Sequence, residues 1–353
     1  MTSLQRSCSW LVLAIYLAPN AYAQRPSQTA ADAVEAINYY NTGVESEEKG
    51  DYLAALGYYE KAIAIDERVY GPLHGPTADL YESAGLVCFK MDSLDRALYY
   101  YGKTLSAREK RFGKESLATA ASYLDIGSVY SKRKSYDTAL DYYAQGLAIA
   151  EKQPDPDRRM LGTFYHSMGT AYLEKKDFEH SLTFFIKALP IYETDTPEDQ
   201  PMIATTHFYI GKSYYQKGLY DAALTHYIAS LTIRKRLVGA ADLSTKMTYR
   251  EVGIAHIAKG ENEEGLKCLN RSDLANSDAY DRIAIINEYG GQAFGQMRYE
   301  GAANLFRFSL QVLEQSNLPE TDLKAFIREL TSHHLQVASS AASHTDVAMI
   351  SVK

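Results

Sequence analysis

The sequence predicts an all-α protein, a solenoid of about seven helix–turn–helix units with a C-terminal capping helix. Three observations lead to this fold class. Glycine recurs at an unbroken period of 42 residues from Gly43 to Gly253, two columns of other side chains keep the same period, and an amphipathic segment follows the last unit. Because only 22 of the 353 residues are glycine, this column indicates an internal repeat in which each unit packs mainly on its neighbours.

Residues 1–23 are predicted to be a secretory signal peptide. They contain one arginine, an apolar run at 10–18 and a small-x-small stretch that ends at Ala23, where we expect cleavage. The run is shorter than the roughly 20 residues that a bilayer span needs, although an uncleaved anchor or a buried first helix is an alternative. We therefore expect an exported protein, periplasmic or extracellular, with a short lead-in at 24–35 and no membrane span in the mature chain.

The repeats are predicted over residues 36–315, in units that start near 36, 78, 120, 162, 204, 246 and 283. Each glycine is followed after twelve residues by a small side chain and after sixteen by a large apolar one. Glycine costs a helix interior about 1 kcal/mol relative to alanine, so a recurring glycine needs a packing reason. We expect the small columns to let two antiparallel helices approach closely while aromatic rings fill the adjacent space. The predicted packing positions are Gly43, Ala55, Gly85, Ala97, Gly127, Ala139, Gly169, Gly211, Ala223, Gly253 and Gly290.

The pattern resembles the tetratricopeptide repeat, which has small residues at positions 8 and 20 and aromatic residues at 11 and 24. In the first unit, Gly43, Ala55 and Tyr59 occupy positions 8, 20 and 24. The usual period of this family is 34 residues. The eight additional residues follow the second helix, as in the 42-residue variant of kinesin light chains and many bacterial proteins. The resemblance implies a right-handed superhelical solenoid.

The C-terminal part of the repeat region is less regular. The sixth unit has Asn262 and Gly265 where its neighbours have an aromatic residue and an alanine, so we expect the array to be weakest, or to change curvature, around 255–280. The segment 320–340 has apolar residues at helical spacing and is predicted to be the capping helix. Residues 341–353 show no periodicity and are predicted to be a disordered tail.

The charge of the chain argues against nucleic acid and acidic membranes as general partners. Without the predicted signal peptide, 36 basic residues stand against 44 acidic ones, a net charge of −8. Binding to polyanions requires a positive field. Basic clusters at 108–111, 132–134 and 234–236 lie at predicted helix ends, and we interpret them as solvated faces.

The sequence contains no pattern typical of an enzyme. A glycine-rich phosphate loop, a nucleophile elbow and a zinc-binding helix motif are all absent. His166 and His207 map near the inner face of the fourth and fifth units, where a lone histidine is more often a polar groove residue than a metal ligand. We therefore expect no catalysis, no cofactor and no metal.

Protein binding is the class of function that remains, and the resemblance indicates which residues would form the binding surface. In tetratricopeptide proteins the first helix of each unit lines a concave groove, and short polar groups there bond the backbone of an extended peptide. The residues carried over are Asn41, Ser83, Lys90, Asp125, Lys132, Ser167, Tyr209 and Lys212. The lysines favour a partner with acidic side chains, whereas the Lys-and-Asn clamp of chaperone-binding relatives is not reproduced. The alternative is that these positions are simply exposed.

The sequence therefore predicts a non-catalytic scaffold or adaptor that binds a peptide segment or a helix of another protein. One alternative is a sensor or regulatory module that acts with a separate membrane signalling protein. Another is a structural protein that self-associates. The sequence does not identify the partner.

Overall fold

The computed structural model describes residues 26–154, 156–193, 199–316 and 321–350, and these ranges contain α-helices and no strand. The predicted signal peptide and its cleavage site at Ala23 lie outside the described residues. The chain forms two compact units, residues 1–164 and 165–353.

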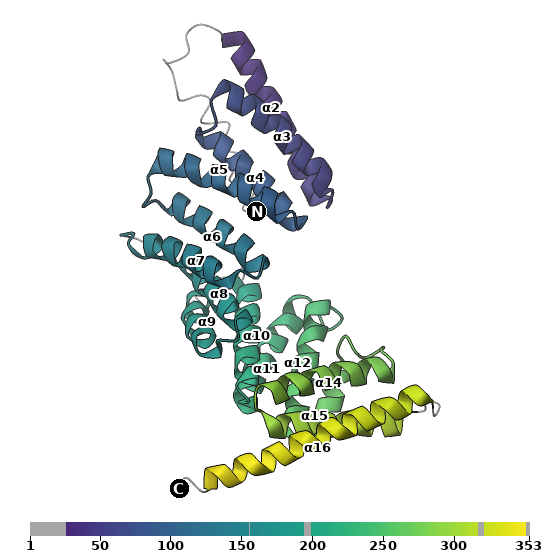
Figure 1. Ribbon diagram of the computed structural model, residues 1–353. Helices are drawn as coiled ribbons and strands as arrows, with labels where there is room; N and C mark the ends of the chain where they lie inside the picture. The colour runs from purple at the N-terminus through teal and green to yellow at the C-terminus, as the bar shows by residue number, and fades with distance from the viewer. Residues whose placement is uncertain (1–25, 155, 194–198, 317–320, 351–353) are drawn as a thin grey trace. The chain divides into compact units, whose positions relative to one another are not determined.

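In the first unit each helix packs on the next one along the chain, and the helices form successive pairs (Figure 1). The bounds are α2 Pro26–Glu48, α3 Tyr52–Val69, α4 Gly75–Lys90, α5 Leu94–Phe112, α6 Leu117–Lys132 and α7 Tyr136–Glu151. The unit ends within α8, Arg158–Glu174. Residues 26–35, expected as a lead-in to the first repeat, form the first turns of α2.

The second unit begins within α8 and continues the pairing (Figure 1). Its helices are α9 Phe178–Tyr192, α10 Gln200–Gln216, α11 Tyr220–Leu237, α12 Leu243–Lys259, α13 Asn262–Leu269, α14 Ala279–Gly295, α15 Tyr299–Gln315 and α16 Asp322–Ile350. The all-α repeat solenoid predicted from the sequence is confirmed by this order of helix pairs.

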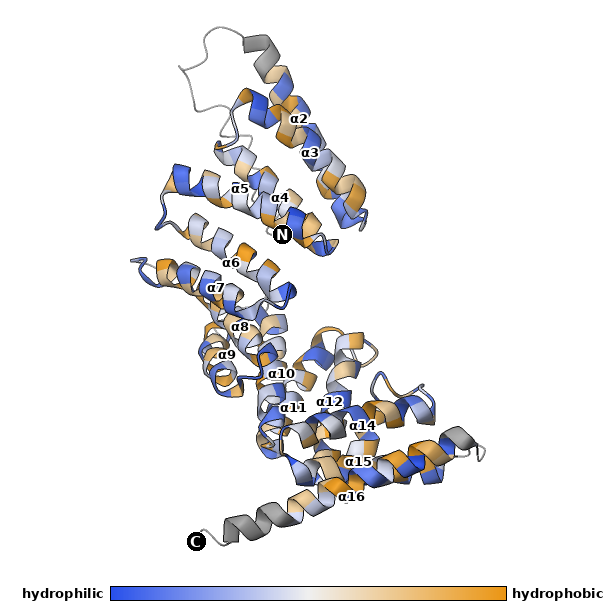
Figure 2. Ribbon diagram, in the orientation of Figure 1, coloured by the Kyte–Doolittle hydropathy of each residue, from blue (hydrophilic) through white to orange (hydrophobic). Residues whose placement is uncertain are grey.

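The glycine column is a packing column. A Cβ added to Gly43 would lie 2.6 Å from the ring of Tyr59, and one added to Gly127 would lie 2.5 Å from the ring of Tyr143. The same relationship with the residue sixteen positions later holds at Gly85, Gly169, Gly211, Gly253 and Gly290. The alanines of the second column are fully buried, namely Ala55, Ala97, Ala139 and Ala223. Hydrophilic and hydrophobic residues alternate along the helices, and hydrophilic residues also occur in the turns between them (Figure 2).

A second set of positions recurs at the same period, in the turn between the two helices of each pair, and shares a backbone conformation. It was not predicted from the sequence. Its members have positive φ angles, which L-residues adopt at a cost of about 1 kcal/mol. They are Gly50, Asp92, Lys134, Lys176, Gly218, Gly260 and Met297. Because side chains other than glycine occupy more than half of these positions, residue type alone does not reveal the column.

The sixth pair is incomplete, in the region where the sequence departs from the repeat pattern. Helix α13 has only 8 residues and is followed by turns up to residue 278. Arg282 holds these turns with hydrogen bonds from Nε to the Leu274 carbonyl, at 3.0 Å, and from Nη2 to the Ala275 carbonyl, at 2.6 Å. Since α13 is short, α15 packs directly on α12, and Asn304 Nδ2 donates to the Ala258 carbonyl at 3.0 Å.

Helix α16 packs on α15 and closes the described part of the second unit. Ala338 is buried beside Phe306, and Asn287 Nδ2 donates to Thr331 Oγ1 at 2.9 Å. The capping helix was expected at 320–340 and a disordered tail at 341–353. The helix instead continues to Ile350, because the alanine-rich and serine-rich stretch after residue 337 contains neither glycine nor proline to end it.

Candidate functional site

Two of the three lysines expected to face an acidic partner, Lys90 and Lys132, are engaged within the first unit. The third, Lys212, is half-buried on α10 of the second unit. Lys90 Nζ donates to Glu47 Oε1 at 2.7 Å, and Glu47 also accepts from the Tyr59 hydroxyl at 2.8 Å. Lys132 Nζ donates to the Phe89 carbonyl at 2.8 Å and lies 3.1 Å from Asp92 Oδ1. Each lysine ends the first helix of its repeat and links that repeat to the preceding one. The two lysines therefore hold successive repeats together and do not stand free for a partner.

The remaining predicted residues differ in their surroundings. Asn41 is exposed on α2, and Ser83 Oγ bonds the Asp79 carbonyl of its own helix at 3.1 Å. In the second unit, Ser167 is half-buried on α8. Tyr209 on α10 stacks on Phe185, with ring centroids 5.6 Å apart and planes within 4°, and burial raises its pKa.

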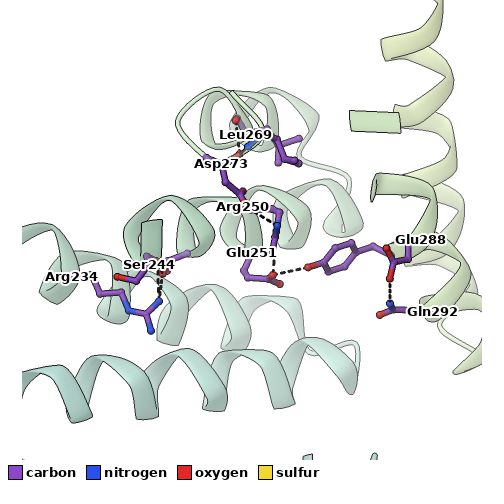
Figure 3. A network of polar contacts seen from close by, with 12 residues as sticks. Arg234, Ser244, Arg250, Glu251, Leu269, Asp273, Glu288 and Gln292 are labelled. Carbon is purple, nitrogen blue, oxygen red and sulfur yellow. Dashed lines mark hydrogen bonds and ion pairs between the residues drawn. The ribbon is translucent and has the colours of Figure 1, made fainter. Parts of the chain in front are cut away.

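Position 6 of the repeat carries an acidic residue in both units, buried as Glu251 in the second and half-buried as Asp125 in the first. In the second unit, Glu251 is 7% exposed and accepts a 2.6 Å hydrogen bond from the Tyr289 hydroxyl. Arg250 lies beside it and donates to Asp273 Oδ2 at 2.7 Å (Figure 3). Burial raises the pKa of Glu251, while the Tyr289 hydrogen bond and the charges of Arg250 and Lys212 oppose that rise. Glu251 is therefore satisfied by groups of its own unit.

Asp125, at the same position in the first unit, lies beside a second acid, Glu82, and the cation Arg108. Arg108 is 9% exposed and donates from Nη2 to Glu82 Oε2 at 2.6 Å and from Nη1 to Ser122 Oγ at 3.2 Å. The buried Oδ2 of Asp125 has no hydrogen-bond donor. Burial and the negative charge of Glu82 raise the pKa of Asp125 to about 8, although Arg108 opposes this.

Arg108 and Arg234 stand three periods apart, and neither is part of the solvated face that we expected. In the second unit, Arg234 Nη1 donates to Thr248 Oγ1 at 2.7 Å and to the Ser244 carbonyl at 3.0 Å (Figure 3). Its guanidinium lies 4.8 Å from the ring of Phe208, which occupies the repeat position of Glu82. The interpretation of both clusters as solvated faces is therefore corrected at these two arginines. The spacing of three periods between Arg108 and Arg234 was the feature of the sequence that could have indicated a structural role for both.

A pocket opens between α2, α3 and α4 of the first unit. At its floor, Asp66 is 5% exposed. Burial raises the pKa of Asp66 to about 6, and a hydrogen bond from Thr77 opposes this rise. The side chain of Asp79 is 60% exposed at the same pocket. The residues that line the pocket are Ala36, Ile37, Tyr40, Asp66, Pro76, Asp79 and Leu80.

Three histidines of the second unit, His166, His207 and His226, are half-buried, and burial lowers the pKa of each. His166 Nδ1 lies 3.2 Å from Thr206 Oγ1, and burial lowers the pKa of His166 to about 4. His207 on α10 pairs with His226 on α11, with Nδ1 atoms 3.0 Å apart, a contact that sequence reasoning missed. Among the described residues, no three histidine, cysteine, aspartate or glutamate side chains converge as metal ligands would. None of the described helices combines the length and apolarity that a membrane crossing requires.

Comparison with known proteins shows which family pattern the chain follows. The tetratricopeptide repeat model matches residues 43–110, 77–152, 118–194 and 202–272, which together make up more than half of the chain. A search of curated proteins finds no match.

Solved structures share the fold at low sequence identity. The apo form of RapI is 15% identical, with a TM-score of 0.59, over 79% of this chain and 98% of RapI. A Rap protein complexed with Competence and Sporulation Factor is 16% identical, with a TM-score of 0.52, over 80% of this chain and 75% of the other. BtubC (BKLC) from P. vanneervenii is 15% identical, with a TM-score of 0.50, over 69% and 87%. At identities this low, the structural similarity shows a common fold and nothing about function.

Proposed function

Because the chain belongs to the tetratricopeptide repeat family, whose solenoids are protein-interaction modules, we propose that it is an exported, non-catalytic scaffold. Its first helices bind a peptide segment or a helix of a partner protein. The pocket between α2 and α4 carries this proposal, because its lining residues other than Asp66 come from the first helices of two successive repeats. Concave sites with apolar walls and a few polar groups are typical of ligand binding.

The contacts of the other first-helix residues support this proposal, because they separate residues that join repeats from residues that stay accessible. Lys90 and Lys132 stabilise the stacking of repeats, whereas Asn41 is exposed on α2 and Asp79 lines the pocket with its side chain 60% exposed. A protein with the same fold is known in complex with Competence and Sporulation Factor, so this architecture is compatible with a bound factor. Export is supported by the signal-peptide pattern of residues 1–23.

Affinity capture tests the proposed function. The bait is chain 24–353, applied to an envelope extract of the native host. One bait variant combines Asn41→Arg with Asp79→Lys on the first helices. The control combines Leu53→Arg with Tyr99→Arg, at exposed positions of the second helices α3 and α5. Circular dichroism verifies that each bait is folded.

We expect a protein that the wild-type and control baits retain and that the first-helix variant loses. Equal retention by all baits, or retention only of copies of the bait, would contradict the proposal. Export is tested by N-terminal sequencing of the protein from its host, with Gln24 as the expected first residue.

A further inference from the structure

We propose that the pocket between α2, α3 and α4 binds a lysine or arginine side chain of the partner, with Asp66 as its counter-ion. This inference rests on the proposed function and specifies the chemistry of the peptide. It also departs from the expectation of an acidic partner, because Lys90 and Lys132, two of the three lysines that carried that expectation, are already paired within the chain.

Asp66 is the first reason. A carboxylate that is 95% removed from solvent is costly unless a cation or several donors compensate it. No basic side chain of the described residues forms an ion pair with Asp66. Arg68 pairs with Asp32 at 3.1 Å and Lys103 pairs with Glu67 at 2.8 Å, while the Arg111 guanidinium lies against Gly75 at the start of α4. Within the part of the chain that the structure describes, the charge at the pocket floor is therefore not neutralised by a side chain.

The walls of the pocket are the second reason. Ala36 and Ile37 of α2 line the pocket together with Pro76 and Leu80 of α4 and with Asp66. Lysine and arginine have an apolar stem and a charged head, and such side chains pack the stem on apolar surface while the head reaches a polar partner. A neutral apolar side chain would fit these walls but would bury Asp66 without compensation.

The rim is the third reason. Asp79 adds a second carboxylate at the pocket, and its side chain is 60% exposed, so it can meet an incoming cation before the cation is desolvated. Arg108 lies 3.8 Å from Asp79, but its short contact at 2.6 Å is with Glu82. Opposite charge at the rim favours the encounter and selects against acidic peptides.

Peptide selection tests the proposal even though the partner is unidentified. A phage library of random twelve-residue peptides is selected on the purified protein, and enriched sequences are synthesised. Each peptide is made with its basic residue and with norleucine in that place, which keeps the stem and removes the charge. Binding is measured on wild type, on Asp66→Asn and on Asp141→Asn, an exposed carboxylate of α7 that serves as the control.

We expect enriched peptides that share a lysine or arginine and lose about tenfold or more in affinity when norleucine replaces it. Asp66→Asn should weaken the basic peptides by a similar factor and leave the norleucine peptides unchanged, while Asp141→Asn has no effect. Selected peptides without a common basic residue, or equal affinity for lysine and norleucine on the wild-type protein, would refute the pocket assignment but leave peptide binding intact. If the folded wild type selects no peptide, both this inference and the proposed function fail.

Discussion

Gly85 of α4 faces the ring of Tyr101 of α5 so closely that a Cβ at residue 85 would lie 2.8 Å from the ring carbons. The same contact recurs in every repeat with the glycine and the large residue sixteen positions later. The helix pair is therefore built around a position where a methyl group does not fit.

Gly85→Ala should destabilise the protein. Overpacking typically costs about 1–3 kcal/mol, which exceeds the gain of about 1 kcal/mol in helix propensity. Gly102→Ala in the neighbouring α5 is the matched control, because open space surrounds that glycine, and it should stabilise by about 0.5–1 kcal/mol. Urea denaturation of both variants measures the two effects. A stabilising Gly85→Ala would show that the glycine column does not set the helix spacing.

Gly50→Ala tests the turn column. Gly50 has φ +79° and open space around it, so any loss reflects backbone conformation alone. We expect a loss of about 1 kcal/mol in unfolding free energy. Gly57→Ala, which also has open space but lies within α3, should stabilise the protein instead. Thermal melts distinguish the two, and equal effects would contradict the role assigned to the turn.

Arg108→Met should be destabilising. It removes the donor to Glu82, whose side chain is 38% exposed, and the positive charge beside Asp125, so the loss should lie between the value for a surface pair and the roughly 3 kcal/mol for a fully buried pair. Arg96→Met removes an arginine whose side chain is 51% exposed, beside the half-exposed Glu60, and should cost less than about 1 kcal/mol. Chemical denaturation of the two variants gives the comparison. Similar losses would indicate that the Arg108 cluster contributes no more than a surface pair.

Asp125→Asn should become increasingly stabilising as pH rises. Burial and Glu82 raise the pKa of Asp125 from about 4 in the unfolded chain to about 8 in the folded protein. Ionisation therefore costs the folded state nothing below the unfolded pKa, and the cost grows between pH 4 and pH 8. A pKa that differs by one between the folded and unfolded states corresponds to about 1.4 kcal/mol of stability. The variant should therefore exceed wild type by at least about 1 kcal/mol at pH 8 and match it at pH 4.

Asp141→Asn is the control for this titration, since Asp141 is exposed on α7. Its stability relative to wild type should not change with pH. Denaturation midpoints across the range from pH 4 to pH 8 provide the measurement. A difference between Asp125→Asn and wild type that stays constant over this range would mean that Asp125 is not the buried acid described here.

The repeat could be predicted because one packing requirement acts in every unit. Gly43 and its six counterparts all meet a large side chain, so residue type itself keeps the period. The turn column could not be recognised in the same way, because Lys134 or Met297 adopts its left-handed conformation without being glycine. The backbone conformation recurs there while the residue type does not.

The site was predicted only at the level of its helices. Lys90 and Asn41 occupy first-helix positions of the repeat, but the first is held by Glu47 and the second is exposed. Whether a groove residue is paired or exposed depends on the side chain that the preceding repeat places beside it. The position of the residue within its own repeat does not give that information. Asp66 escaped notice because it lies on a second helix, outside the positions that the resemblance designates.

Site-specific photocrosslinking in the native host tests the central claim, that the first helices of the first unit contact a partner protein. Benzoylphenylalanine is placed at Asn41 or Asp79 on the first helices, and at Leu53 or Tyr99 on the second helices as exposed controls. The account predicts a common crosslinked protein from the first two positions and none from the other two. Crosslinks confined to Leu53 and Tyr99 would contradict it.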